Sequence, residues 1–152
     1  MNRSMYCPKC EEDRAFRFEE RKETFDVRGE KIALKVPQWR CPKCGESIVD
    51  DSFGDPVAKA FDAYRAEHGL LTPAEIRRIR EQWGLSQAAF ATLLGMSQAT
   101  INRYEMGALQ QEKEDELIRA CDSRDHMRNL LHRRGRLVTD RQRRTAEATL
   151  GQ

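Results

Sequence analysis

Four of the five cysteines form two identical motifs, Cys7-Pro8-Lys9-Cys10 and Cys41-Pro42-Lys43-Cys44. Each motif places two sulfur atoms on one side of a tight turn, so the two turns together supply the four corners of a tetrahedron. Four thiolates close the shell of a structural zinc ion and leave no open position for catalysis. We therefore expect one structural Zn²⁺ per chain, with iron or disulfide bonds as the alternatives. The expected ligands are Cys7, Cys10, Cys41 and Cys44.

Residues between the two motifs have the alternating pattern of strands. In residues 31–40, Ile32, Leu34 and Val36 alternate with more polar positions, and residues 14–24 show a similar spacing. Gly29 marks a turn between them. The pattern predicts a zinc-ribbon-like β-hairpin domain over residues 1–51. About fifty residues bury little apolar surface, so a bound metal would supply much of the stability.

The apolar spacing after Ser52 changes to about 3.6 residues, which is typical of helices. Residues 52–69 are predicted to form a connecting helix or linker that starts at Asp55-Pro56. Residues 70–132 are predicted to form a helical domain, whose first helix starts at Thr72 with a capping box. The predicted fold class is therefore α+β: a small zinc-bound hairpin domain followed by an all-α helix-turn-helix domain.

Residues 85–105 have the pattern of a helix-turn-helix. Ser86 and Ser97 are suited to cap two short helices, and Gly95 separates the helices. The second helix is predicted to turn Ile101 and Tyr104 inward and a polar face outward. The outward residues are Gln98, Ala99, Thr100, Asn102 and Arg103. A plain helical hairpin with a solvated polar face is the alternative.

The polar face suits the edges of bases in the major groove. Gln98 matches adenine, Arg103 matches guanine or a phosphate, and Ala99 matches a thymine methyl group. Ser86 and Gln87 stand at a helix N-terminus, where backbone N–H groups favour a phosphate. We therefore predict binding to double-stranded DNA.

Composition limits the remaining possibilities. The 152 residues are 39% hydrophobic and 34% charged, with a mean hydropathy of −0.79. No apolar run is long enough to span a bilayer, and residues 1–10 lack the apolar region of a secretory signal, so no secretion is expected. The expected location is the cytoplasm, with no membrane partner. The three histidines stand beside no nucleophile or carboxylate pair, so no enzymatic activity is expected.

The basic excess lies at the C-terminal end. Residues 122–152 contain 8 arginines and 4 acidic residues, a balance of +4. We expect residues 133–152 to be a basic, poorly ordered tail. Its arginines are predicted to reach DNA phosphates, and a merely solvated terminus is the alternative.

The chain also resembles known families. Residues 70–120 resemble the Cro/phage-repressor (Xre) helix-turn-helix. The resemblance lies in the Leu-Ser-Gln at the start of the motif and in the Arg-Tyr-Glu-x-Gly at its end, which is Arg103-Tyr104-Glu105-Met106-Gly107 here. The cysteine motifs followed by this fold, over about residues 5–120, resemble the MqsA antitoxins with a YgiT-type zinc finger. The resemblance implies a homodimeric autorepressor that binds a palindromic operator in its own promoter. Its zinc domain would bind and neutralise a toxin, typically an mRNA-cleaving ribonuclease.

The resemblance implies further site assignments. Cys7, Cys10, Cys41 and Cys44 match the four metal-binding cysteines of the family. Arg103 matches the family's base-reading arginine, and Arg65 matches an arginine between the domains that contacts DNA. Ala99 stands where the family has an assisting asparagine, so the operator should differ, with Gln98 or Asn102 as substitutes. A regulator without a toxin partner and an adaptor with an unused helix-turn-helix are the rival interpretations.

Overall fold

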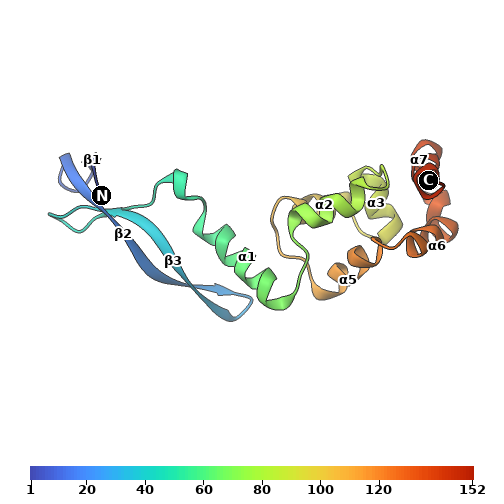
Figure 1. Ribbon diagram of the computed structural model, residues 1–152, viewed down its shortest axis with the longest axis horizontal. Coiled ribbons are helices and arrows are strands. Elements are labelled where there is room, and N and C mark those ends of the chain that lie inside the picture. Colours follow the sequence, from blue (N-terminus) through green and yellow to red (C-terminus); the bar gives the residue numbers. More distant parts are fainter. The chain divides into compact units, whose positions relative to one another are not determined.

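The alternating residues of the N-terminal half lie in a long β-hairpin (Figure 1). The computed structural model describes residues 1–152, and in it strand β2 (Glu12–Val27) pairs antiparallel with strand β3 (Glu30–Arg40). Ile32 and Val36 are buried and Lys35 between them is exposed, which confirms the predicted alternation.

The turn of the hairpin consists of two residues. Arg28 and Gly29 both have positive φ angles, 51° and 83°, as a type I′ turn requires. The guanidinium carbon of Arg28 lies 5.8 Å from the centroid of the Tyr64 ring, a cation–π distance. The turn is thereby attached to the helix that follows the sheet.

Two further strands complete the sheet at the base of the hairpin, and the sequence analysis does not predict them. Strand β1 (Asn2–Cys7) pairs with residues 12–17 of β2, and strand β4 (Ser47–Ile48) pairs with residues 39 and 40 of β3. The strand order is β1-β2-β3-β4. The first cysteine motif begins at the last residue of β1 and continues into the loop to β2, and the second lies in the loop between β3 and β4.

The core of this sheet is small. The buried cluster at its base consists of Cys7, Phe16, Trp39 and Cys41. Phe18 packs edge-on against Trp39, with 5.7 Å between the ring centroids. Half of the buried residues in this cluster are therefore candidate metal ligands.

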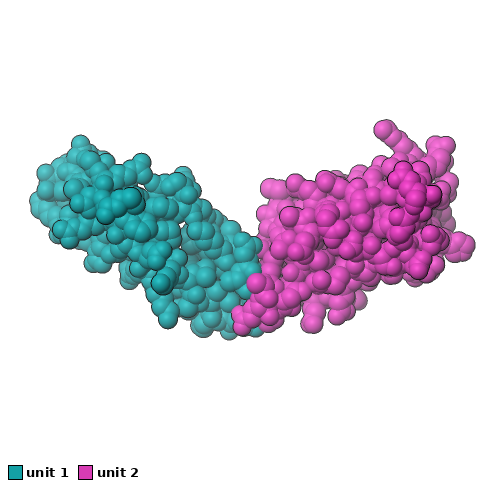
Figure 2. Space-filling view, viewed as in Figure 1, with its two compact units in different colours: residues 1–64 teal, residues 65–152 magenta.

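The chain divides into two compact units, residues 1–64 and residues 65–152 (Figure 2). A 3-10 helix, η1 (Asp51–Phe53), precedes helix α1 (Pro56–His68), and the division falls inside α1. The Asp55 carboxylate accepts a hydrogen bond from the Val57 N–H at 2.9 Å, in agreement with the predicted helix start. The predicted connector is thus a helix that both units share.

The second unit is entirely helical. Its first five complete helices are α2 (Pro73–Glu81), α3 (Gln87–Leu94), α4 (Gln98–Glu105), α5 (Glu112–Ala120) and α6 (Arg124–Arg134). The capping box predicted at Thr72 is present, because Thr72 accepts from the Glu75 N–H and Glu75 accepts from the Thr72 N–H. No helix of the chain is both long enough and apolar enough to cross a membrane.

The helices enclose one apolar core. Its fully buried members include Ile76, Phe90, Ile101, Ile118 and Met127, one from each of α2 to α6. Because all five helices contribute, the position of each depends on the others. Trp83 is also buried there, and its indole N–H donates to the Cys121 carbonyl at 2.8 Å.

The end of the chain differs from the predicted irregular tail. A 3-10 helix, η2 (Gly135–Leu137), leads into helix α7 (Asp140–Leu150). Ala146 is fully buried in the core of the second unit, and Val138 and Leu150 pack against that core. The segment has few apolar residues and six arginines, so its composition indicates a solvated tail. The spacing of the apolar residues is nevertheless sufficient for one buried helix face.

A buried ion pair joins helices α2 and α4. Both Nε and Nη2 of Arg80 donate to the Glu105 carboxylate, with the shortest separation 2.7 Å, and the Glu105 side chain has no exposed surface. Gln87 at the start of α3 donates to the same carboxylate at 2.8 Å. Glu105 is thereby bound to both preceding helices, which fixes the orientation of α4.

Replacing Glu105 by alanine should strongly destabilise the second unit, because the buried Arg80 charge loses its partner. We expect the free energy of unfolding to fall by about 3–5 kcal/mol, measured by urea denaturation with far-ultraviolet circular dichroism. Arg78→Ala is the control, since it breaks an exposed pair with Asp122 and should cost about 1 kcal/mol or less. Equal losses in both variants would contradict this role for Glu105.

Candidate metal centre and nucleic-acid interface

The two cysteine motifs adopt the same turn. The Glu11 N–H donates to the Cys7 carbonyl at 2.8 Å, and the Gly45 N–H donates to the Cys41 carbonyl at 3.0 Å. Glu11 and Gly45, which follow the motifs, both have positive φ, 57° and 77°. Glu11 therefore adopts the left-handed conformation that glycine adopts more readily at the second turn.

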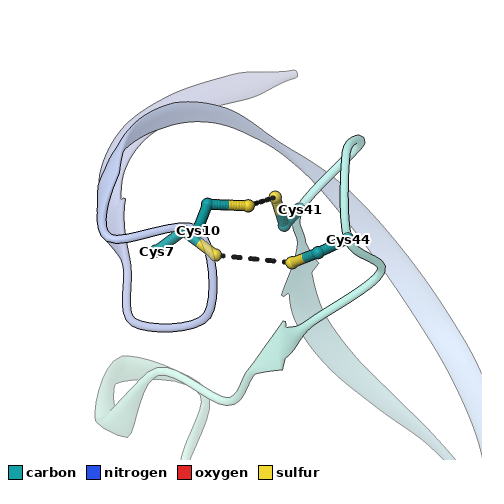
Figure 3. Close-up of side chains that lie close together, drawn as sticks. All are labelled: Cys7, Cys10, Cys41 and Cys44. Carbon is teal, nitrogen blue, oxygen red and sulfur yellow. Dashed lines mark hydrogen bonds between the residues drawn. The ribbon is translucent and has the colours of Figure 1, made fainter.

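The two turns bring four sulfur atoms together (Figure 3). All four Sγ atoms lie within 4.8 Å of one another. The Cys7–Cys44 sulfur separation is 3.5 Å and the Cys10–Cys41 separation is 3.9 Å. A tetrahedral tetrathiolate site with metal–sulfur bonds of about 2.3 Å has edges of about 3.8 Å. The cluster predicted from the motifs is thus formed, and it could hold a metal ion.

The strand register explains why the sulfur atoms meet. Cys7 is the last residue of β1, and Cys41 directly follows β3. Strand β2 lies between β1 and β3 and pairs with both. The two motifs, which are distant in sequence, therefore emerge from the same end of one sheet.

The protein environment affects the thiols differently. Backbone N–H groups of Cys44 and Lys43 lower the pKa of Cys41 to about 6, against an opposing effect of burial. Burial, together with the neighbouring sulfur atoms, raises the pKa of Cys10 to about 12. At neutral pH the Cys41 thiol therefore loses its proton readily, whereas the Cys10 thiol keeps its proton. A cation that binds all four sulfur atoms would release protons from the rest.

The polar face predicted on the second short helix is exposed in α4. Gln98, Ala99, Asn102 and Arg103 are exposed, and Thr100 is half-buried. Ile101 and Tyr104 are buried, as predicted. Ser97 caps the helix by accepting from the Thr100 N–H at 3.1 Å. The structure thus brings the five predicted residues to one helix.

The two residues predicted at the start of α3 have partners within the protein. Ser86 accepts from the Ala89 N–H at 3.1 Å and so caps α3, and its own N–H donates to Oε1 of Gln142 at 2.8 Å. The Gln87 side chain donates to Glu105 and, at 3.3 Å, to Asn102 of α4. Gln87 therefore links the N-terminus of α3 to the polar face of α4.

Arg65 lies apart from that face. Only 3% of its surface is exposed, and Nη2 donates to the carbonyl oxygens of Gly107 and Ala108, just after α4. Its Nη2 atom already has main-chain acceptors, and the expected contact of Arg65 with DNA stays a prediction. Its main-chain contacts hold the segment that follows α4.

Sequence reasoning missed three residues that support this surface: Arg80, Glu105 and Gln142. Glu105 is adjacent to Tyr104, which is predicted to face inward, and this position indicates that the glutamate is buried and needs a positively charged partner. Nothing local indicates that the partner is Arg80, twenty-five positions earlier. Gln142 lies in the segment predicted to be irregular, so its contact with Ser86 was not foreseen.

Comparison with protein families identifies most of the chain as a member of a known family. The family model described as the antitoxin component of a bacterial toxin-antitoxin system, MqsA, matches residues 5–132. That range contains all four clustered cysteines and helices α2 to α5, and most of α6. No curated protein matches the chain at a significant level.

Removing the metal should unfold the first unit and leave the second folded, because cysteines form half of the buried cluster at the base of the sheet. The chain has two tryptophans, Trp39 in the first unit and Trp83 in the second. With a strong chelator and a reductant, the emission of a Trp83→Phe variant should shift to longer wavelength. The emission of a Trp39→Phe variant should stay unchanged.

Cys121 provides the control for this experiment. Burial raises the pKa of its thiol to about 12, and it lies outside the cluster. Cys121→Ser should therefore bind metal as the unaltered chain does, whereas Cys10→Ser should lose it. Unchanged Trp39 emission after metal removal would show that the sheet does not depend on the ion.

Proposed function

Because this chain belongs to the family of MqsA antitoxins, we propose that it is a zinc-containing antitoxin that also represses its own operon. In this proposal the first unit binds a toxin and the second unit binds an operator. The observation that carries the DNA-binding part is the exposed polar face of α4, which is fixed from behind by buried contacts.

Zinc is the proposed ion because four cysteines form a closed set of sulfur ligands. Zn²⁺ prefers tetrahedral coordination and binds thiolates strongly, and sulfur separations of 3.5 and 3.9 Å suit that geometry. Four protein ligands leave no position for a substrate or a reactive water. The role that this donor set supports is structural, and no enzymatic role is proposed.

The helices α3 and α4 are proposed to act as a helix-turn-helix. They are joined by a three-residue turn in which Gly95 has a φ angle of 72° and its N–H donates to the Thr92 carbonyl at 3.2 Å. In this motif the second helix enters the major groove and the first crosses the backbone. Gln98 and Arg103 are proposed to contact base edges, and two copies of the chain are proposed to read the halves of a palindrome.

The exposed edges of the hairpin are the observation that favours a protein partner for the first unit. Strand β1 pairs only with residues 12–17 of β2, and β4 pairs only with residues 39 and 40 of β3. The outer sides of residues 19–27 and 30–38 therefore have no strand partner within the sheet. Free strand edges are surfaces on which another protein can add a strand.

Replacing Arg103 by alanine should weaken operator binding by about 1–3 kcal/mol, which is roughly five- to 150-fold in Kd, because one bidentate base contact is lost. The measurement is fluorescence anisotropy with a duplex from the promoter upstream of the gene. Arg128→Ala removes the same charge from an exposed pair with Asp125 on α6 and should leave Kd nearly unchanged. Equal affinity of the Arg103 variant and the unaltered chain would refute this assignment.

Co-expression with the product of the adjacent gene tests the antitoxin part. The full chain should co-purify with that product and abolish its toxicity. A Cys10→Ser/Cys44→Ser variant should lose both properties, because the first unit loses its metal. Arg103→Ala is the matched control and should retain both, since it alters only the second unit. If the unaltered chain binds its promoter but never the neighbouring product, the chain is a regulator without a toxin partner.

A further inference from the structure

The helix α7 lies beyond the matched family range, which ends at residue 132. It is nevertheless fixed to the second unit by side-chain contacts and by the burial of Ala146. The segment 133–152 contains six arginines and two acidic residues, a balance of +4. A positively charged element is thus held at one defined place on the proposed DNA-binding unit.

That place is the loop that leads into α3. Oε1 of Gln142 accepts the Ser86 N–H at 2.8 Å. A Cβ atom on Gly84 would lie 2.5 Å from Cγ2 of Thr145, so α7 leaves no room for a larger residue there. The first two turns of α7 therefore lie directly beside residues 84–86.

Four of the six arginines, Arg134 and the three arginines of α7, fall into two groups. Arg134 donates to the Thr92 carbonyl, and Arg143 pairs with Asp140 at 3.1 Å, so both stabilise the fold. Arg141 and Arg144 are exposed on the side of α7 opposite Ala146. Neither forms an ion pair with a carboxylate, and the Arg144 Nε donates only to the Asp140 carbonyl of its own helix. Their charges are available to a partner.

We propose that α7 is a second DNA-contacting element, in which Arg141 and Arg144 bind backbone phosphates next to the start of α3. The inference rests on the proposed function, since it takes α3 and α4 to dock as a helix-turn-helix. In that arrangement the N-terminus of the first helix lies against the sugar–phosphate backbone. Gln142 and Thr145 touch the loop before that N-terminus, so the neighbouring guanidinium groups lie beside the same backbone.

Phosphates fit this pair of side chains better than an acidic protein surface. Arg141 and Arg144 are three positions apart on one helix face, which presents two cations along a line. Duplex DNA offers a regular row of negative charges. Moreover, both arginines belong to the unit that carries α4, whereas the proposed toxin-binding hairpin belongs to the other unit.

The test compares the full chain with an Arg141→Gln/Arg144→Gln variant on two duplexes of equal length. One duplex carries the promoter and the other carries the same bases in scrambled order. Kd is measured by fluorescence anisotropy between about 50 and 200 mM salt. Each lost phosphate contact should reduce the slope of log Kd against log salt by about 0.9, so we expect a reduction of about 1.8 on both duplexes. Arg128→Gln, which removes a charge already paired with Asp125, should not change the slope.

The preference for the promoter over the scrambled duplex should stay the same in the double variant, because phosphate contacts carry no sequence information. An unchanged slope, or tighter binding by the double variant, would overturn the role of α7. If the unaltered chain shows no preference for the promoter, operator recognition fails instead. In that case the slopes on the scrambled duplex still decide whether α7 contacts DNA.

Discussion

The small size of the buried cluster at the base of the sheet is the constraint on which the structure of the first unit depends. Four buried residues form this cluster, and two of them are cysteines of the sulfur cluster, whereas Ile32 and Val36 are buried outside it. A sheet with so small a core cannot offset the entropy of ordering its chain by hydrophobic burial alone. A metal ion held by the four sulfur atoms would add stability at the end of the sheet where β1 and β3 finish. The hairpin can then extend beyond the core because its base is fixed.

In the second unit, the main structural requirement is that the short helix α4 is held in one orientation. Helix α4 has only eight residues, too few to be stable by itself. Ile101 and Tyr104 fasten its inner side, and the Glu105 carboxylate joins it to Arg80 and Gln87. Because the buried pair is directional, it restricts rotation of α4 about its axis in a way that apolar packing does not. The exposed face is therefore presented in one register.

Features encoded within a few residues could be predicted from the sequence. The cysteine turns, the hairpin alternation and the caps at Thr72, Ser86 and Ser97 depend on neighbours at most four positions away. Features that depend on distant partners could not. The strands β1 and β4 exist only because β2 and β3 provide edges for them. The burial of Arg65 depends on carbonyl groups more than forty positions later. Helix α7 has few apolar residues, and a core must already exist for Ala146 to enter.

The outer edges of the hairpin strands, which have no strand partner over most of their length, have a consequence for solubility. A two-stranded ribbon whose outer edges have no strand partner over most of their length can pair with copies of itself. The charged residues along those edges, among them Lys22, Lys31 and Lys35, oppose such pairing because repeated copies would bring like charges together. The same protection weakens as ionic strength rises. Fibre formation by the isolated protein is therefore expected to be promoted by salt and suppressed by any ligand that covers these edges.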